Sequence, residues 1–148
     1  MSTCAFTGHR LLPEDFDKNL LEEKIEGLIQ GGANEFLCGM AVGFDLLCAE
    51  IVLKLKRKYD LKLVACIPCE SQSAYYSQAD KRRYDKILAA CNEKIVLAPL
   101  YYNGCMQKRD RYMVERADVV FCYLTQKTGG TYYTVNYAKS SEVKIVYF

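Results

Sequence analysis

The chain has 148 residues, which suits one domain, and a domain of that size buries roughly 70% of the surface of its unfolded chain. Its apolar share of 51%, charged share of 26% and formal net charge of +2 are ordinary for a globular protein and favour no particular charged partner. No apolar run approaches the roughly 18 residues that a membrane span needs, and the N-terminus does not resemble a secretion signal.

Apolar runs alternate with segments of helical periodicity along the whole chain. In chain order the pattern predicts a strand at 4–7, a helix at 13–30, a strand at 35–39, a helix at 44–58, a strand at 61–67, a helix at 78–91, a strand at 94–98, a helix at 105–116, a strand at 117–124, a helix at 131–140 and a strand at 143–148. Pro13 suits the first turn of the first helix, and Gly31 and Gly32 suit its end.

The predicted strands are continuous apolar runs, which are typical of strands covered on both faces. Strands that alternate with helices form a parallel sheet with right-handed crossovers. No linker, repeat or low-complexity segment divides the chain. We therefore expect one domain over residues 1–148, a three-layer α/β/α Rossmann-like fold with a mostly parallel sheet.

The eight cysteines lie mostly inside apolar runs, as Cys38, Cys66 and Cys122 do. Reduced cysteine behaves there as a small core residue, so we expect a cytoplasmic protein rather than a disulfide framework. Cys66 and Cys69 have C-x-x-C spacing, but a zinc site would need a second such pair or two histidines, and the chain has one histidine. We therefore expect no metal site.

Four of the predicted strand-to-helix junctions carry unusual residues, and in a parallel sheet they meet at one edge, where ligands bind. They are Thr7-Gly8-His9-Arg10, Gly39 to Asp45, Pro68 to Gln72, and Thr128-Gly129-Gly130-Thr131. Glycines let a backbone approach a ligand, and helix N-termini attract anions. The pattern indicates a ligand that carries phosphate, although neither the G-x-G-x-x-G fingerprint nor a P-loop is present.

The side chains at these junctions suggest separate roles. Arg10 and Arg109 are candidates for phosphate pairing. Asp45 would either accept from a ribose hydroxyl or favour the start of its helix. Gln72 is either a base or ribose contact or a plain loop residue, and one of the loop tyrosines 75, 76, 101 and 102 could stack on a base. The candidate ligand-binding residues are Thr7, Gly8, His9, Arg10, Gly39, Gly43, Phe44, Asp45, Gln72, Arg109, Gly129, Gly130 and Thr131.

These motifs, in this order, resemble the SLOG superfamily and, within it, the small YpsA-like proteins. The resemblance also rests on Ala49-Glu50, Met113-Val114 and Ala117-Asp118, and it covers nearly the whole chain. It implies a Rossmann-like fold that binds a nucleotide or nucleotide-derived ligand, with DprA and the cytokinin-activating phosphoribohydrolases as distant relatives. The catalytic glutamate of those hydrolases has no counterpart after Gly130, which leaves His9 and Glu50 as candidate catalytic groups.

Three functions follow as alternatives. The first is a protein that binds or senses a nucleotide without strong catalysis, the second is a nucleotide hydrolase that cleaves an N-glycosidic bond, and the third is a DprA-like binder of single-stranded nucleic acid. The runs 81–84 and 108–112 mix basic and aromatic residues as single-strand binders do, but they also fit solvated helix faces. We expect a small nucleotide-derived ligand and no other cofactor, with a homodimer as a candidate assembly. We do not expect nucleic acid or a membrane as a partner.

Overall fold

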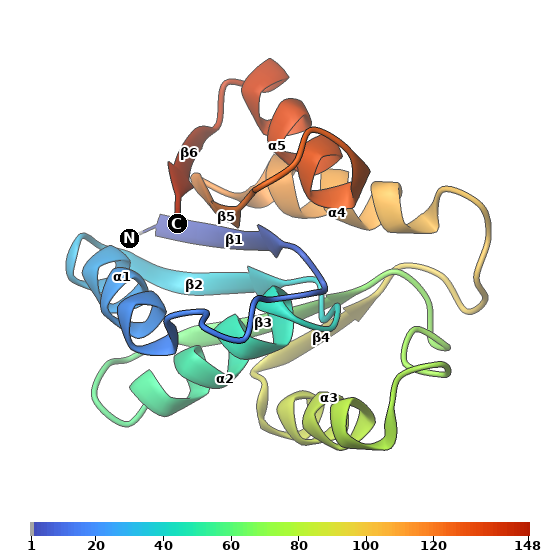
Figure 1. Cartoon of the computed structure of the whole chain (residues 1–148), viewed down its shortest axis with the longest axis horizontal. Helices are drawn as coiled ribbons and strands as arrows, with labels where there is room; N and C mark the ends of the chain where they lie inside the picture. The colour runs from blue at the N-terminus through green and yellow to red at the C-terminus, as the bar shows by residue number, and fades with distance from the viewer. Residues whose placement is uncertain (1) are drawn as a thin grey trace.

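The structure is a computed structural model, and it describes residues 2–148. Strands and helices alternate without exception through these residues (Figure 1). The elements are β1 (Ser2–Gly8), α1 (Lys18–Gln30), β2 (Ala33–Cys38), α2 (Phe44–Leu55), β3 (Lys62–Ile67), α3 (Gln78–Ala90), β4 (Glu93–Val96), α4 (Cys105–Arg116), β5 (Val119–Tyr123), α5 (Gly129–Ser140) and β6 (Lys144–Tyr147).

The six strands form one sheet in the order β4-β3-β2-β1-β5-β6, and every neighbouring pair is parallel. Helices α1, α2 and α3 cover one face and helices α4 and α5 cover the other, as Figure 1 shows. The three-layer Rossmann-like fold expected from the sequence is therefore confirmed. After β4 the chain returns to the middle of the sheet to place β5 beside β1, so the winding reverses between β1 and β5. That reversal is where open parallel sheets bind ligands.

Each face of the sheet has its own core. The face under α1, α2 and α3 buries a cluster of phenylalanines that includes Phe6, Phe36 and Phe121. The face under α4 and α5 buries smaller side chains, such as Val114 and Val135. Because both faces are covered, the central strands hold continuous apolar runs, and this is why the alternation of strands and helices along the chain could be predicted.

The start of the first helix was predicted wrongly. Helix α1 begins at Lys18, and Pro13 lies in a preceding turn in which the Phe16 N–H donates to the Pro13 carbonyl at 3.0 Å. The helix begins there because Asp17 caps it, its side chain accepting from the Leu20 N–H at 2.9 Å. The second helix ends at Leu55 rather than at residue 58.

The last helix also differs from its prediction, because α5 begins at Gly129 and not at residue 131. The glycine pair therefore forms the first turn of this helix instead of the loop before it. Among residues 2–148 no helix is both long enough and apolar enough to cross a bilayer.

Candidate functional site

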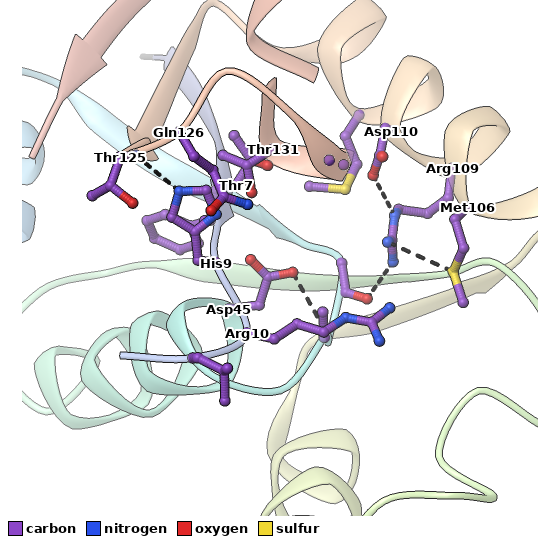
Figure 2. A pocket seen from close by; sticks show the side chains of 18 residues that line it. Thr7, His9, Arg10, Asp45, Met106, Arg109, Asp110, Thr125, Gln126 and Thr131 are labelled. Atoms are coloured by element: carbon purple, nitrogen blue, oxygen red, sulfur yellow. Dashed lines mark hydrogen bonds and ion pairs between the residues drawn. The ribbon is translucent and has the colours of Figure 1, made fainter. Parts of the chain in front are cut away.

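A cavity of about 450 Å³ opens at the carboxyl ends of β1 and β5, where the winding of the sheet reverses. Three of the four junctions singled out in the sequence contribute to it, together with the start of α4. Among the sequence candidates, its walls include Thr7, Gly8, His9, Arg10, Gly39, Asp45, Arg109, Gly129, Gly130 and Thr131. Figure 2 shows Asp45 and Arg10 between the ends of β1 and α5 on one side and the side chains of α4 on the other.

The start of α5 forms one wall of the cavity. Its N-cap residue, Thr128, makes no side-chain hydrogen bond to the helix, although threonine is a good capping residue. The first N–H groups of a helix have no partner inside the helix and carry the positive end of its dipole. A Cβ placed on Gly130 would meet no atom within 4 Å, so this backbone stands open toward the cavity. The arrangement suits an anion.

Asp45, in the first turn of α2, supplies a buried carboxylate to the same cavity. Its side chain is 6% exposed, and one oxygen, Oδ2, accepts from the Ala41 N–H at 3.3 Å. Its other oxygen, Oδ1, is buried and has no hydrogen-bond partner among the described residues. Burial raises the pKa of Asp45 to about 7, and the nearby Arg109 guanidinium acts against that rise. The site therefore contains an acceptor that the protein itself does not satisfy.

Arg10 follows β1 and is the exposed cation of the site. Within residues 2–148 it takes part in no ion pair within 4.0 Å, in contrast to Arg83 and Arg109. Its guanidinium is therefore available to an anionic ligand, and a guanidinium can bind a phosphate through two parallel hydrogen bonds.

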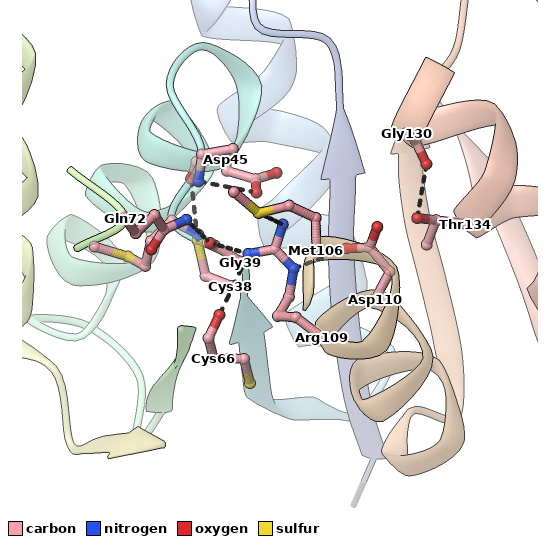
Figure 3. Close-up of polar contacts among 12 residues, drawn as sticks. Cys38, Gly39, Asp45, Cys66, Gln72, Met106, Arg109, Asp110, Gly130 and Thr134 are labelled. Atoms are coloured by element: carbon pink, nitrogen blue, oxygen red, sulfur yellow. Dashed lines mark hydrogen bonds and ion pairs between the residues drawn. The ribbon is translucent and has the colours of Figure 1, made fainter. Parts of the chain in front are cut away.

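Arg109, on α4, is buried and bonded to the protein instead. Its Nη1 donates to the Gly39 carbonyl and, at 3.4 Å, to the Cys66 carbonyl, and its Nε donates to Asp110 at 2.8 Å (Figure 3). It therefore ties α4 to the ends of β2 and β3. The sequence predicted a phosphate contact at this position, but most of the donor capacity of this guanidinium is already used within the protein.

Three of the motif glycines are required by the packing of the protein itself. A Cβ on Gly8 would lie 2.3 Å from the Phe44 ring, and one on Gly43 would lie 2.3 Å from the Arg10 carbonyl oxygen. A Cβ on Gly39 would lie 2.7 Å from the Arg109 guanidinium. Gly43 and the fully buried Phe44 do not line the cavity. These two sequence candidates instead pack against Arg10 and Gly8, which do line it.

The remaining candidates lie in different places. His9 lines the cavity, and its Nε2 accepts from the Thr125 N–H at 2.9 Å, which places the ring proton on Nδ1 and holds the loop after β5. Gln72 lies outside this cavity and lines a neighbouring one. Glu50 lines neither of them and instead pairs with Arg83 on α3 at 2.7 Å.

Sequence reasoning missed several lining residues, among them Met106, Asp110, Thr125 and Gln126. Thr125 and Gln126 directly follow β5, so the rule that ligands bind at strand ends could have found them. Nothing in the sequence marks Met106, because only the return of the chain from β4 to β5 brings the start of α4 to this edge.

Comparisons with known proteins agree with this architecture. The model of the YspA SLOG family (YpsA) matches residues 15–147, a range that excludes the junction 7–10. A UPF0398 protein of Halalkalibacterium halodurans is 29% identical over 129 residues, which are 84% of this chain and 68% of that protein. A UPF0398 protein of Bacillus licheniformis is 27% identical over 131 residues, 86% of this chain and 72% of that protein.

Solved structures with a similar fold come from a DNA-processing protein. DprA from Streptococcus pneumoniae matches with a TM-score of 0.75 at 19% identity, over 99% of this chain and 50% of its own. DprA from Helicobacter pylori, which has a single-stranded DNA binding mode, matches with a TM-score of 0.72 at 19% identity. The match covers 99% of this chain and 64% of that chain. At these identities the likeness concerns the fold, and this chain spans half of the Streptococcus protein. The family match covers nearly the whole chain, and the chain therefore belongs to the YspA SLOG family.

Proposed function

We propose that the protein binds a nucleotide or a nucleotide-derived ligand, with a phosphate at the start of α5 and a ribose hydroxyl at Asp45. The observation that carries the proposal is the unpartnered Oδ1 of Asp45, which is buried in the wall of the cavity. A buried carboxylate oxygen without a donor is costly, and such groups are rare in folded proteins. A hydroxyl group of a bound ligand would supply the missing donor.

The phosphate position rests on separate observations. The uncapped first turn of α5, the open space at Gly130 and the unpaired Arg10 all border the same cavity. Together they offer backbone N–H donors, a helix dipole and a guanidinium, which is the set of groups that binds phosphate in proteins. A volume of about 450 Å³ lies within the range of small-molecule sites.

Binding without hydrolysis is the form of the proposal that we favour. Glu50, one of the two candidate catalytic groups, is paired with Arg83 and lies away from the cavity. Asp110 is paired with Arg109. A hydrolase that used this cavity would therefore depend on Asp45 or His9, and the test includes both residues.

The test is thermal denaturation with AMP and ADP, followed by chromatography of the nucleotide. A ligand at about 100 times its dissociation constant adds roughly 2.7 kcal/mol, which for a chain of this length raises the melting temperature on the order of 8 °C. Arg10→Ala and Gly130→Val should make the rise much smaller, because they remove only the phosphate contacts, whereas Arg82→Ala, which removes an exposed cation outside the cavity, should keep the full rise.

The nucleotides should remain intact after prolonged incubation. Release of free base, lost in Asp45→Asn or His9→Ala, would establish the hydrolase instead. If neither nucleotide shifts the melting temperature at millimolar concentration, the proposed binding is refuted for adenine mononucleotides.

A second candidate is binding of single-stranded nucleic acid, and the observation that favours it is the fold shared with DprA from Helicobacter pylori. This likeness leans against the expectation that nucleic acid is not a partner. A labelled oligothymidylate titrated at two salt concentrations tests it, because each phosphate contact steepens the loss of affinity with salt. A complex that persists at physiological salt would favour single-stranded nucleic-acid binding over nucleotide binding as the function.

A further inference from the structure

A second cavity, of about 520 Å³, adjoins the first. The two share four lining residues, which are Arg10, Ala41, Met106 and Arg109. The remaining walls of the second cavity come mostly from the loop between β3 and α3, with Val42 before α2, Asp80 in the first turn of α3 and Tyr101 in the loop between β4 and α4. A ligand that passes Arg10 and Met106 can therefore extend from one cavity into the other.

Aromatic side chains surround the second cavity. Tyr75 is 100% exposed and Tyr101 is 63% exposed, and both line it. Tyr76 forms a fixed part of the wall, because its hydroxyl donates to the Met40 carbonyl at 2.9 Å and its ring packs edge-on against Tyr84 at 5.6 Å. Exposed rings beside a fixed ring offer stacking surfaces for a planar group of a ligand.

The buried polar groups in this wall already have partners inside the protein. Gln72 donates from Nε2 to the Gly39 carbonyl at 2.8 Å, and its Oε1 accepts from the Tyr84 hydroxyl at 2.9 Å. At the edge of the cavity, Ser77 accepts from the Asp80 N–H as the cap of α3. The wall therefore has stacking surfaces but few fixed groups that could read the edge of a base. Gln72, a candidate base contact in the sequence, instead holds its loop to the end of β2 and to α3.

We infer that the second cavity binds the base of the ligand by stacking against Tyr75 and Tyr101, with little discrimination between bases. The inference rests on the proposed function, in which the phosphate and ribose of the same ligand occupy the first cavity. Specificity then comes from the sugar-phosphate part, which Arg10, Asp45 and the start of α5 contact. The base contributes affinity, since every base has a face that can stack on a tyrosine ring.

The test measures the affinities of AMP, GMP, CMP and UMP by calorimetry, with ribose 5-phosphate as a probe that lacks a base. We expect the four nucleotides to bind within about fivefold of one another. In the double variant Tyr75→Ala, Tyr101→Ala all four should weaken by about 5- to 150-fold, the range reported for loss of a base–aromatic stack. Ribose 5-phosphate should bind the variant as it binds the unmodified protein.

Two controls separate stacking from unfolding. Tyr147→Ala removes another exposed tyrosine, on β6 and outside both cavities, and should change no affinity. Tyr75→Phe, Tyr101→Phe keeps both ring faces and should preserve binding. Because Tyr75 and Tyr101 are exposed, the melting temperature of the unliganded alanine variant should stay within a degree or two.

The outcomes distinguish this inference from the proposed function. If ribose 5-phosphate binds through Arg10 but the alanine variant retains full affinity for nucleotides, the inference is wrong and the proposed function stands. A preference above about 100-fold for one base would also overturn it. If the four nucleotides bind and respond to the tyrosine changes but not to Arg10→Ala, the phosphate position is wrong and the stacking site stands. If none of them binds, both are refuted.

Discussion

Replacing Asp45 by asparagine should stabilise the unliganded protein above neutral pH while weakening the ligand. The side chain keeps its shape and its acceptor for the Ala41 N–H, but it loses a charge that is buried with one oxygen unpartnered. Burial raises the pKa of Asp45 from 3.8 to about 7 in the folded protein. That gap corresponds to about 4 kcal/mol by which ionisation of this group destabilises the fold.

The direction in which stability changes with pH follows from the number of protons bound in the folded and unfolded states. Between pH 4 and pH 7 the unfolded chain has lost the Asp45 proton while the folded protein keeps it, so stability falls as pH rises through this window. Above pH 7 both states are ionised and the loss is complete. Asparagine does not titrate, and the other acids are common to both proteins. The stability of Asp45→Asn relative to the unmodified protein should therefore rise by about 3 kcal/mol between pH 4.5 and pH 8.

Urea denaturation at pH 4.5 and pH 8, in buffers without phosphate, measures this difference, and equal slopes in the two proteins would show that the unfolded states are comparable. The same variant should bind AMP about 10- to 100-fold more weakly, the usual value of a hydrogen bond to a charged group. A stability difference that is flat between the two pH values, or that favours the unmodified protein more at pH 8, would refute the assignment of Asp45 as a buried, unsatisfied carboxylate.

Four further substitutions separate the roles of residues at the same edge of the sheet. Gly130→Ala should stabilise the unliganded protein by about 0.5–1 kcal/mol, because the new Cβ lies in open space on a helix. Gly8→Ala should destabilise it by about 1–3 kcal/mol or more, because the new Cβ overlaps the buried Phe44 ring. Thermal denaturation of the two variants measures both effects. Arg109→Met should lower the free energy of unfolding by about 3–5 kcal/mol, since it leaves the Gly39 carbonyl and the partly buried Asp110 carboxylate without their donor. Chemical denaturation measures this loss, and a loss below about 1 kcal/mol would contradict the role of Arg109 as a buried tie between α4 and β2. His9→Ala should speed hydrogen exchange of the Thr125 amide, because that N–H loses its acceptor. If the Thr125 amide exchanges as slowly in the variant as in the unmodified protein, the His9 ring does not anchor the loop after β5.

The order of strands and helices along the chain was predictable because most strands hold a continuous apolar run and the segments between them have helical periodicity. The residues at which the helices begin and end were harder to predict. Pro13 and Glu14 look like a helix start, but Asp17 provides the cap that fixes α1 at Lys18. The edge that carries the site was also predictable, since it follows from the parallel topology alone.

The individual roles were harder to predict because they depend on contacts between distant segments. Arg109 has the residue type of a phosphate ligand, yet it lies 70 residues from the Gly39 carbonyl that it binds. Glu50 lies on α2 as expected, but its partner Arg83 comes from the next helix. The glycines are ambiguous for the same reason, since a sequence does not show whether the space beside a glycine is filled by the protein or left open.

The starts of three helices differ in their capping, and the difference bears on function. Asp17 and Ser77 cap α1 and α3 with side-chain hydrogen bonds. Thr128 has a residue type that could do the same for α5, but its side chain makes no such bond. The unmade cap and the unpartnered Asp45 oxygen are both unfavourable in the free protein, and both border one cavity. A ligand with an anionic group and a hydroxyl donor relieves both at once, whereas inorganic phosphate relieves only the first. A nucleoside should therefore still raise the melting temperature of Arg10→Ala, and it should lose that effect in Asp45→Asn.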